Sequence, residues 1–330
     1  MNDSLCLLHF IFIFGEGVPL LGDLKLTTKK ELAGKCALVS GATRGAGRAI
    51  AVSLAQAGAY VYATGRSSRT YGPSSIGRPE TIEETEEMIR ATGGEGQSVR
   101  VDHMDFALVG KLIDKINKEK GKLDILVNDI WGGESVVDWS KPFWEQDVTT
   151  QMSMFMNAIV THINTTVKAI HLLMKSEKAL IVEITDGVGY HYRGNLFYSL
   201  VKITTNHLAL AYAEDLKERG FDRIISIGLT PGFLRSEQML DLFGVSEENW
   251  RDAIKSHPDF AGSETPYYIG RALVSLISDP NFQRFNGQTL STWGLSKIYD
   301  FREKDGSRPD WENFHKLYKE GKINPLKWEY

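Results

Sequence analysis

The sequence predicts an α/β protein built on parallel strands, and two observations carry this prediction. Short apolar segments alternate with segments of helical periodicity from about Lys35 to Trp293, which is typical of strands joined by crossover helices. The first strand and helix of this series are joined by a turn that holds three glycines, as expected where the backbone turns sharply at the edge of a sheet. Because the alternation has no linker-like break, we expect one domain.

We place that domain at residues 32–298, between an N-terminal extension at residues 1–31 and a C-terminal tail at residues 299–330. The chain has 330 residues, 42% of them hydrophobic, which is enough for a sizeable core. The extension contains an apolar run from Leu5 to Phe14 that is too short to span a bilayer. This run resembles either a poor signal-peptide core or a loosely packed extension, and we favour the extension because no basic residue precedes it.

Charge and cysteine content narrow the expected partners. The chain has 38 Lys and Arg against 42 Asp and Glu, a formal net charge of −4, so neither nucleic acid nor an anionic membrane surface is an expected partner. Cys6 and Cys36 are the only cysteines, and they predict neither a disulfide framework nor a metal site. A reducing cytoplasm is therefore the expected compartment.

The glycine turn predicts an anion site. A strand near Lys35 to Val39 precedes it and a helix follows, so the turn ends in backbone N–H groups without helical partners at the positive end of the helix dipole. An ordinary strand-to-helix connection is the alternative. The residues expected to face a dinucleotide here are those of the turn: Gly41, Thr43, Arg44, Gly45, Ala46 and Gly47.

The second strand, Tyr60 to Thr64, favours NADP(H) over NAD. In a dinucleotide site the end of this strand reaches the adenosine ribose, where an acid bonds a 2′-hydroxyl and a basic residue holds a 2′-phosphate. Gly65 and Arg66 follow this strand and Arg44 lies in the glycine turn, so two guanidinium groups can meet the phosphate. Two solvated surface arginines are the alternative.

Polar residues end the next two strands, where a parallel sheet meets its ligand. Ser98 to Val101 is followed by Asp102 and His103, and Asp102 either accepts a hydrogen bond from an adenine amino group or caps a helix. Leu123 to Val127 is followed by Asn128. We expect Asp102, His103 and Asn128 to contact the cofactor.

The loop after Asn128 carries four aromatic residues, Trp131, Trp139, Phe143 and Trp144. They could line an apolar pocket, and core packing is the expected account of at least half of them. The region from Gln151 to Met174 reads as one long helix whose apolar residues recur every three or four positions. Asn157 lies among them, and a lone asparagine there is usually a hydrogen-bonded polar group.

Tyr198 and Lys202 are the strongest candidates for chemistry. At a spacing of four residues they share one helix face. An ammonium beside a phenol favours the phenolate, which brings proton exchange toward neutral pH. A helix that carries both residues by chance is the alternative. Beyond the sixth strand, Pro231 and Gly232 bring backbone to the ligand crevice, and Ser236 could bond a cofactor amide.

The order of these motifs resembles the short-chain dehydrogenase/reductase family over about residues 32 to 295. The matching features are the three-glycine turn, Asn128, Tyr198 with Lys202, and Pro231 with Gly232. The resemblance implies a doubly wound (Rossmann) seven-stranded parallel sheet in three α/β/α layers, assembled as a homodimer or homotetramer. It also implies a small carbonyl or alcohol substrate.

The same resemblance implies a role for each matching residue. Tyr198 would be the general acid/base, Lys202 would hold the nicotinamide ribose, and Asn157 approximates a catalytic asparagine, although the glycine usual three residues later is missing. Where the family usually has a serine after the fifth strand, this chain has Asp186, with Thr185 one residue earlier. An ionised carboxylate cannot donate a hydrogen bond to a substrate oxygen, whereas a protonated carboxyl or the Thr185 hydroxyl can.

Two hypotheses follow. The first is an NADP(H)-dependent oxidoreductase that acts on a carbonyl or alcohol. The second is an NADP-binding regulator or scaffold whose turnover is impaired because Asp186 replaces the serine.

Overall fold

The structure is a computed structural model that describes residues 30–330 except residues 75 and 134. The part from Glu31 onward forms one compact unit. The predicted N-terminal extension lies outside the described residues except for its last two positions. No helix in residues 30–330, so far as they are described, is long and apolar enough to cross a membrane.

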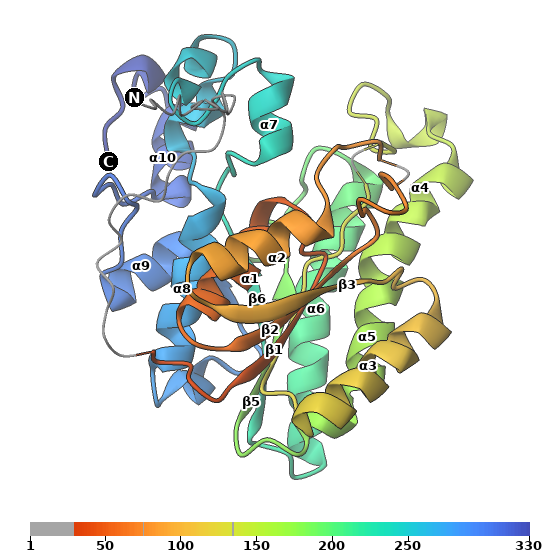
Figure 1. Cartoon of the computed structure of the whole chain (residues 1–330). Helices are drawn as coiled ribbons and strands as arrows, with labels where there is room; N and C mark the ends of the chain where they lie inside the picture. The colour runs from red at the N-terminus through yellow and green to blue at the C-terminus, as the bar shows by residue number, and fades with distance from the viewer. Residues whose placement is uncertain (1–29, 75, 134) are drawn as a thin grey trace, which may run out of the picture. The chain divides into compact units, whose positions relative to one another are not determined.

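Seven strands form one parallel sheet in the order β3-β2-β1-β4-β5-β6-β7 (Figure 1). This order confirms the predicted doubly wound fold. Strands β1, β4, β5 and β6 are buried throughout, because helices cover both faces of the sheet. The strands are β1 Cys36–Ser40, β2 Tyr60–Gly65, β3 Glu95–Arg100, β4 Ile125–Asn128, β5 Ala179–Ile184, β6 Ile224–Thr230 and β7 Thr289–Ser291.

Helices cover the sheet in two layers (Figure 1). One layer packs apolar side chains of α1, α2, α8 and α9 against the sheet, and the other those of α3, α5 and the end of α6. The helices of the first layer are α1 Gly45–Gln56, α2 Ile82–Ala91, α8 Pro266–Ser278 and α9 Thr292–Tyr299. Those of the second are α3 Phe106–Lys120, α5 Thr161–Leu173 and α6 Leu196–Glu218.

The chain order reverses between β1 and β4. In a doubly wound sheet the connections leave β1 and β4 toward opposite faces at this point, which opens a crevice at the carboxyl ends of the strands. The glycine turn follows β1 and the aromatic loop follows β4. Both therefore lie at this crevice.

The long helix predicted over Gln151 to Met174 is interrupted. It consists of α4 Val148–Phe155, a π-helical segment η2 Met156–Val160 and α5 Thr161–Leu173. A π segment inserts one residue into the helical ladder, which shifts the faces that follow. A pattern of apolar residues every three or four positions does not detect one extra residue, so the prediction missed it.

The residues after β6 build a small aromatic cluster. Trp250, Phe260 and Phe314 are buried together, so the end of the chain packs back onto the domain. The elements here are α7 Glu237–Leu242, η3 Trp250–Lys255, η4 Pro258–Gly262, α10 Trp311–Lys319 and η6 Pro325–Lys327. Two further 3-10 turns lie elsewhere, η1 Phe143–Glu145 and η5 Phe282–Phe285.

Candidate active site

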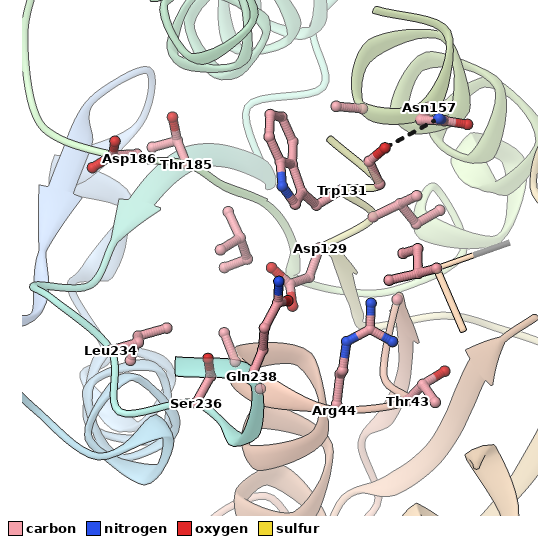
Figure 2. Close-up of a pocket in the computed structure, with 18 of the residues that line it drawn as sticks. Thr43, Arg44, Asp129, Trp131, Asn157, Thr185, Asp186, Leu234, Ser236 and Gln238 are labelled. Carbon is pink, nitrogen blue, oxygen red and sulfur yellow. Dashed lines mark hydrogen bonds between the residues drawn. The ribbon is translucent and has the colours of Figure 1, made fainter. Parts of the chain in front are cut away.

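A cavity of about 910 Å³ lies at the carboxyl ends of the strands. Figure 2 shows Thr185 and Asp186 on one side of it and Thr43 and Arg44 on the opposite side, with Trp131 between them. The glycine turn, the loop after β4, the start of α6 and the segment after β6 all contribute to the lining.

The structural reason for glycine differs among the three glycines of the turn. A Cβ on Gly41 would lie 2.4 Å from the Asp129 carbonyl oxygen, and one on Gly47 would lie 2.4 Å from the Gly41 carbonyl oxygen. These two glycines therefore permit close backbone packing. Gly45 has a φ of +56°, and a Cβ there would lie 3.8 Å from the Ser236 Cβ, an ordinary contact, so the positive φ is what favours glycine. The Gly45 N–H donates to Glu237 Oε2 at 2.8 Å. A carboxylate already accepts from the start of α1, so this turn suits an anion.

Arg44 and Arg66 both line the cavity. Arg66 Nη1 lies 4.0 Å from Asp102 Oδ2, and Asp102 Oδ1 accepts from the Met104 N–H at 3.0 Å. A Cβ at position 65 would lie 2.0 Å from the Thr43 hydroxyl oxygen. Glycine therefore ends β2, because a larger residue would displace Thr43.

His103 and Asn128 direct their side chains into the core. The His103 ring contacts the Thr64 hydroxyl at 2.8 Å and the Thr165 hydroxyl at 2.7 Å, and burial lowers the pKa of His103 to about 3. Asn128 is fully buried, bonds Glu183 and is absent from the cavity lining. Of these two residues, only His103 borders the cavity, and its ring nitrogens are already bonded to threonine hydroxyls.

Tyr198 and Lys202 lie at the start of α6, which Asn195 caps by accepting from the Tyr198 N–H at 3.1 Å. The Tyr198 hydroxyl donates to Asp186 Oδ2 at 2.7 Å. Lys202 Nζ lies 4.2 Å from the centroid of the Trp131 ring and 5.5 Å from that of the Tyr198 ring. Phenol, carboxyl and ammonium groups thus meet at one end of the cavity.

Thr185 is directed differently from Asp186. Its hydroxyl donates to the Lys202 carbonyl oxygen at 3.1 Å, and the residue is buried. The two candidates for the missing serine are therefore separated: Asp186 contacts Tyr198, and Thr185 fastens the end of β5 to α6.

Asn157 lies in the π segment and lines the cavity. Its Nδ2 lies 3.5 Å from the Gly132 carbonyl oxygen, the bond drawn in Figure 2. Its own carbonyl oxygen accepts from the Thr161 hydroxyl. π segments occur often at functional sites, and this one turns Asn157 toward the loop after β4.

The Pro231–Gly232 turn is fixed by a buried carboxyl group. Glu264 Oε2 accepts from the Gly232 N–H at 3.0 Å and from the Thr292 hydroxyl at 2.7 Å. Ser236 caps α7 by accepting from the Met239 N–H at 3.4 Å and lines the cavity.

The aromatic loop divides into two pairs. Trp131 and Trp139 line the cavity and contact Tyr198 edge-on, with ring centroids 5.5 and 5.1 Å away. Phe143 and Trp144 contact each other and are exposed.

Sequence reasoning missed a second aromatic group that lines the cavity. Phe233 stacks on His257 and on Trp311, with centroids 5.2 and 6.0 Å away, and all three line the cavity. Trp311 belongs to the tail to which no chemistry was assigned. Its position beside Phe233 depends on packing between distant segments, so no local pattern signals it.

Among the described residues, no group of three or more His, Cys, Asp or Glu side chains is arranged to hold a metal ion.

Comparison with known proteins identifies the family. The sequence profile described as short chain dehydrogenase matches residues 35–243. Dehydrogenase/reductase SDR family member 1 from Mus musculus is 29% identical over 300 residues, which cover 89% of this chain and 91% of that protein.

Solved structures share the fold. A short chain dehydrogenase from Mycobacterium thermoresistibile has a TM-score of 0.69 at 21% identity, covering 85% of this chain and 93% of its own. One from Mycobacterium paratuberculosis, solved bound to NAD, has a TM-score of 0.61 at 19% identity, covering 81% and 99%. The chain therefore belongs to the short-chain dehydrogenase/reductase family of nicotinamide-dependent oxidoreductases.

Proposed function

We propose that this protein is an NADP(H)-dependent oxidoreductase that interconverts a carbonyl compound and its alcohol, with Tyr198 as general acid/base. The observation that carries the proposal is the meeting of the Tyr198 hydroxyl, Asp186 and Lys202 at one end of the cavity that the glycine turn also lines. When bound, the nicotinamide supplies or accepts the hydride.

In the reducing direction Tyr198 donates its proton to the substrate oxygen as the hydride reaches the carbonyl carbon. The phenolate left behind is stabilised by the Lys202 ammonium one turn along α6. In the oxidising direction the phenolate takes the proton back. General acid/base catalysis of this kind contributes roughly 10² to 10⁴-fold in rate.

Asp186 takes the place of the usual serine. As an acceptor 2.7 Å from the Tyr198 hydroxyl oxygen, it keeps the phenol protonated and oriented at the cavity. A carbonyl oxygen that enters the site replaces Asp186 as the acceptor of this proton. The substrate must therefore approach beside the carboxylate.

Arg44 and Arg66 support NADP(H) as the cofactor. Both line the cavity, Arg44 just before α1 and Arg66 just after β2, which ends in Gly65 in place of an acid. A 2′-phosphate carries up to two negative charges, which guanidinium groups bind by paired hydrogen bonds. The Gly45 turn suits the pyrophosphate.

Two groups of aromatic side chains line the cavity. Trp131 and Trp139 lie next to Tyr198, and Phe233, His257 and Trp311 form a second group. Flat apolar groups pack well against such rings. A small or medium apolar ketone or its alcohol is the proposed substrate.

Oxidation of NADPH against a panel of ketones and aldehydes tests the proposal, with Tyr198→Phe as the matched control. We expect turnover by the wild type and a loss of about 10²-fold or more in the variant, with NADPH binding unchanged. Equal rates in both proteins would reject the role of Tyr198.

One observation favours the regulator hypothesis. The Tyr198 hydroxyl already donates its hydrogen bond to Asp186, which would hinder proton transfer to a substrate. A regulator binds NADPH and turns over no substrate. The variant Asp186→Ser separates the two functions. If the variant is less active than the wild type, Asp186 takes part in the reaction and the protein is an oxidoreductase. If only the variant is active, Asp186 impairs turnover and the regulator hypothesis is supported.

Self-association and a cytoplasmic location complete the proposal. Exposed apolar side chains gather on α4, η2, α5 and α6, as expected of an interface between copies: Met152, Met156, Ile163, Val167, Leu200 and Leu210. Light scattering of wild type and Leu200→Glu tests for a dimer or tetramer. Cys36 is a buried free thiol whose pKa burial raises to about 12, which suits a protein of a reducing compartment.

A further inference from the structure

A carboxylate and a histidine are buried together at the active-site cavity, which His162 helps to line, and the proposed reaction does not use them. Glu183 lies in the interior of β5 and is fully buried, and His162 on the first turn of α5 is 1% exposed. His162 Nδ1 lies 2.6 Å from Glu183 Oε2. A charge buried at this depth is costly unless it is paired and hydrogen-bonded.

The other ring nitrogen of His162 reaches the active-site loop. Nε2 lies 3.0 Å from the carbonyl oxygen of Ile130. A backbone carbonyl can only accept, so Nε2 must carry a hydrogen. Nδ1 and Glu183 Oε2 are only 2.6 Å apart, so a second proton must lie between them, since two lone pairs would repel each other at this distance. The other carboxyl oxygen, Oε1, accepts from Asn128 Nδ2 at 2.8 Å. Both ends of the imidazole are thus engaged.

Ile130 connects this pair to the catalytic end of the cavity. The next residue is Trp131, whose ring contacts Tyr198 edge-on at 5.5 Å and lies 4.2 Å from Lys202 Nζ. A shift of the Ile130 carbonyl therefore moves the ring that borders both groups.

We propose that His162, held by Glu183, is a positioning residue that fixes the Ile130 carbonyl and thereby the orientation of Trp131 against Tyr198 and Lys202. The expected effect on catalysis rests on the proposed function, whereas the expected effect on the orientation of Trp131 does not.

Two other titratable side chains face the pair. His103, whose pKa burial lowers and the neighbouring His162 lowers further, is neutral and bonded to threonine hydroxyls. Burial, aided by the Glu183 carboxylate, raises the pKa of Tyr212 on α6. Neither carries a competing charge, so the hydrogen bond between His162 and Glu183 is the contact that holds the ring.

The double variant His162→Phe/Glu183→Gln separates positioning from stability. His162→Phe alone leaves the Glu183 carboxyl group buried without its hydrogen-bond partner and is expected to destabilise the fold. In the double variant the substituted glutamine carries no charge and can still accept from Asn128, so stability returns while the donor to Ile130 stays absent. His171→Gln, on an exposed site of the same helix, is the matched control.

The readout independent of activity is ¹⁹F NMR of protein labelled with 5-fluorotryptophan, with the Trp131 resonance assigned through Trp131→Phe. We expect this resonance to shift in the double variant and to stay in place in the control. It should also stay in place in Glu183→Gln alone, because the glutamine amide can donate to His162 Nδ1 and the Nε2–H can still donate to the Ile130 carbonyl oxygen. An unshifted Trp131 resonance in a folded double variant would overturn the proposal, whether or not the protein turns over a ketone.

Kinetics and histidine NMR complete the test. For the double variant we expect kcat to fall by about tenfold to a hundredfold with the Kd for NADPH unchanged. Wild-type activity there would contradict the proposal. If the double variant does not fold, ¹⁵N-histidine NMR of the wild type decides: a His162 Nε2 without a proton contradicts the proposal.

Discussion

The Tyr198 hydroxyl donates to Asp186 Oδ2 over 2.7 Å, between the start of α6 and the residues that follow β5. A serine at position 186 would offer a donor to a substrate oxygen, whereas Asp186 accepts the hydrogen bond of the Tyr198 hydroxyl. In the proposed mechanism Tyr198 is the acid, and the substrate oxygen replaces Asp186 as the acceptor of its proton.

The first prediction concerns this acceptor. Asp186→Asn keeps an oxygen that accepts from Tyr198, so we expect kcat within about tenfold of wild type, whereas Asp186→Leu removes the acceptor and lowers kcat by about 10²-fold. Steady-state kinetics with a responsive ketone measures both. A Leu variant as active as the Asn variant would show that Asp186 does not orient the phenol.

The second prediction concerns cofactor choice. Arg44→Ala and Arg66→Ala each remove a cation from the 2′-phosphate end, so each should weaken NADPH binding by about tenfold and change NADH binding little. Titration with both nucleotides measures this difference. Equal losses for the two nucleotides would contradict a phosphate contact.

The third prediction assigns Thr185 a structural task. Its hydroxyl donates to the Lys202 carbonyl oxygen, so Thr185→Val should cost about 1 kcal/mol of unfolding free energy and leave the chemical step intact, and Thr185→Ser should restore the stability. Chemical denaturation and kcat are measured together. A stable Val variant with no turnover would transfer the serine role from Asp186 to Thr185.

The fourth prediction concerns pH and Glu264. Burial raises the pKa of this carboxyl from its ordinary value of 4.5 to about 8. As pH rises, the Glu264 carboxyl group loses its proton near pH 4.5 in the unfolded chain but only near pH 8 in the native state. The free energy of unfolding therefore falls between about pH 4.5 and 8. Glu264→Gln removes this titration.

Thermal unfolding of wild type and Glu264→Gln across that range measures the effect. We expect the melting temperature of the wild type to fall relative to that of the variant as pH rises. Parallel curves would show that Glu264 titrates at its ordinary pKa.

The sequence predicted the architecture because the central strands are buried on both faces and therefore appear as apolar runs such as Ile224 to Leu229. It also predicted that Tyr198 and Lys202 would share a helix face, since their spacing alone determines it. The Asp186 contact with Tyr198 depends on how the loop after β5 folds back, so the sequence left Asp186 and Thr185 as alternatives.

Other features depend on contacts between distant segments. Asn128 was expected at the cofactor, but its register opposite Glu183 on β5 draws its amide into the core. The pair of His162 and Glu183 joins a helix to a strand, and neither residue stands out in its own segment. Trp311 reaches the cavity only because α10 packs on the cluster around Phe260.

Transfer of label to a ketone from NADPH that carries deuterium at both C4 positions of the nicotinamide tests the central claim most directly. The wild type should give an alcohol with one deuterium on the former carbonyl carbon, and Tyr198→Phe should bind the cofactor equally well and form this product about 10²-fold more slowly or worse. NADPH oxidation that leaves the alcohol carbon unlabelled, or labelled product formed equally fast by the variant, would contradict the account.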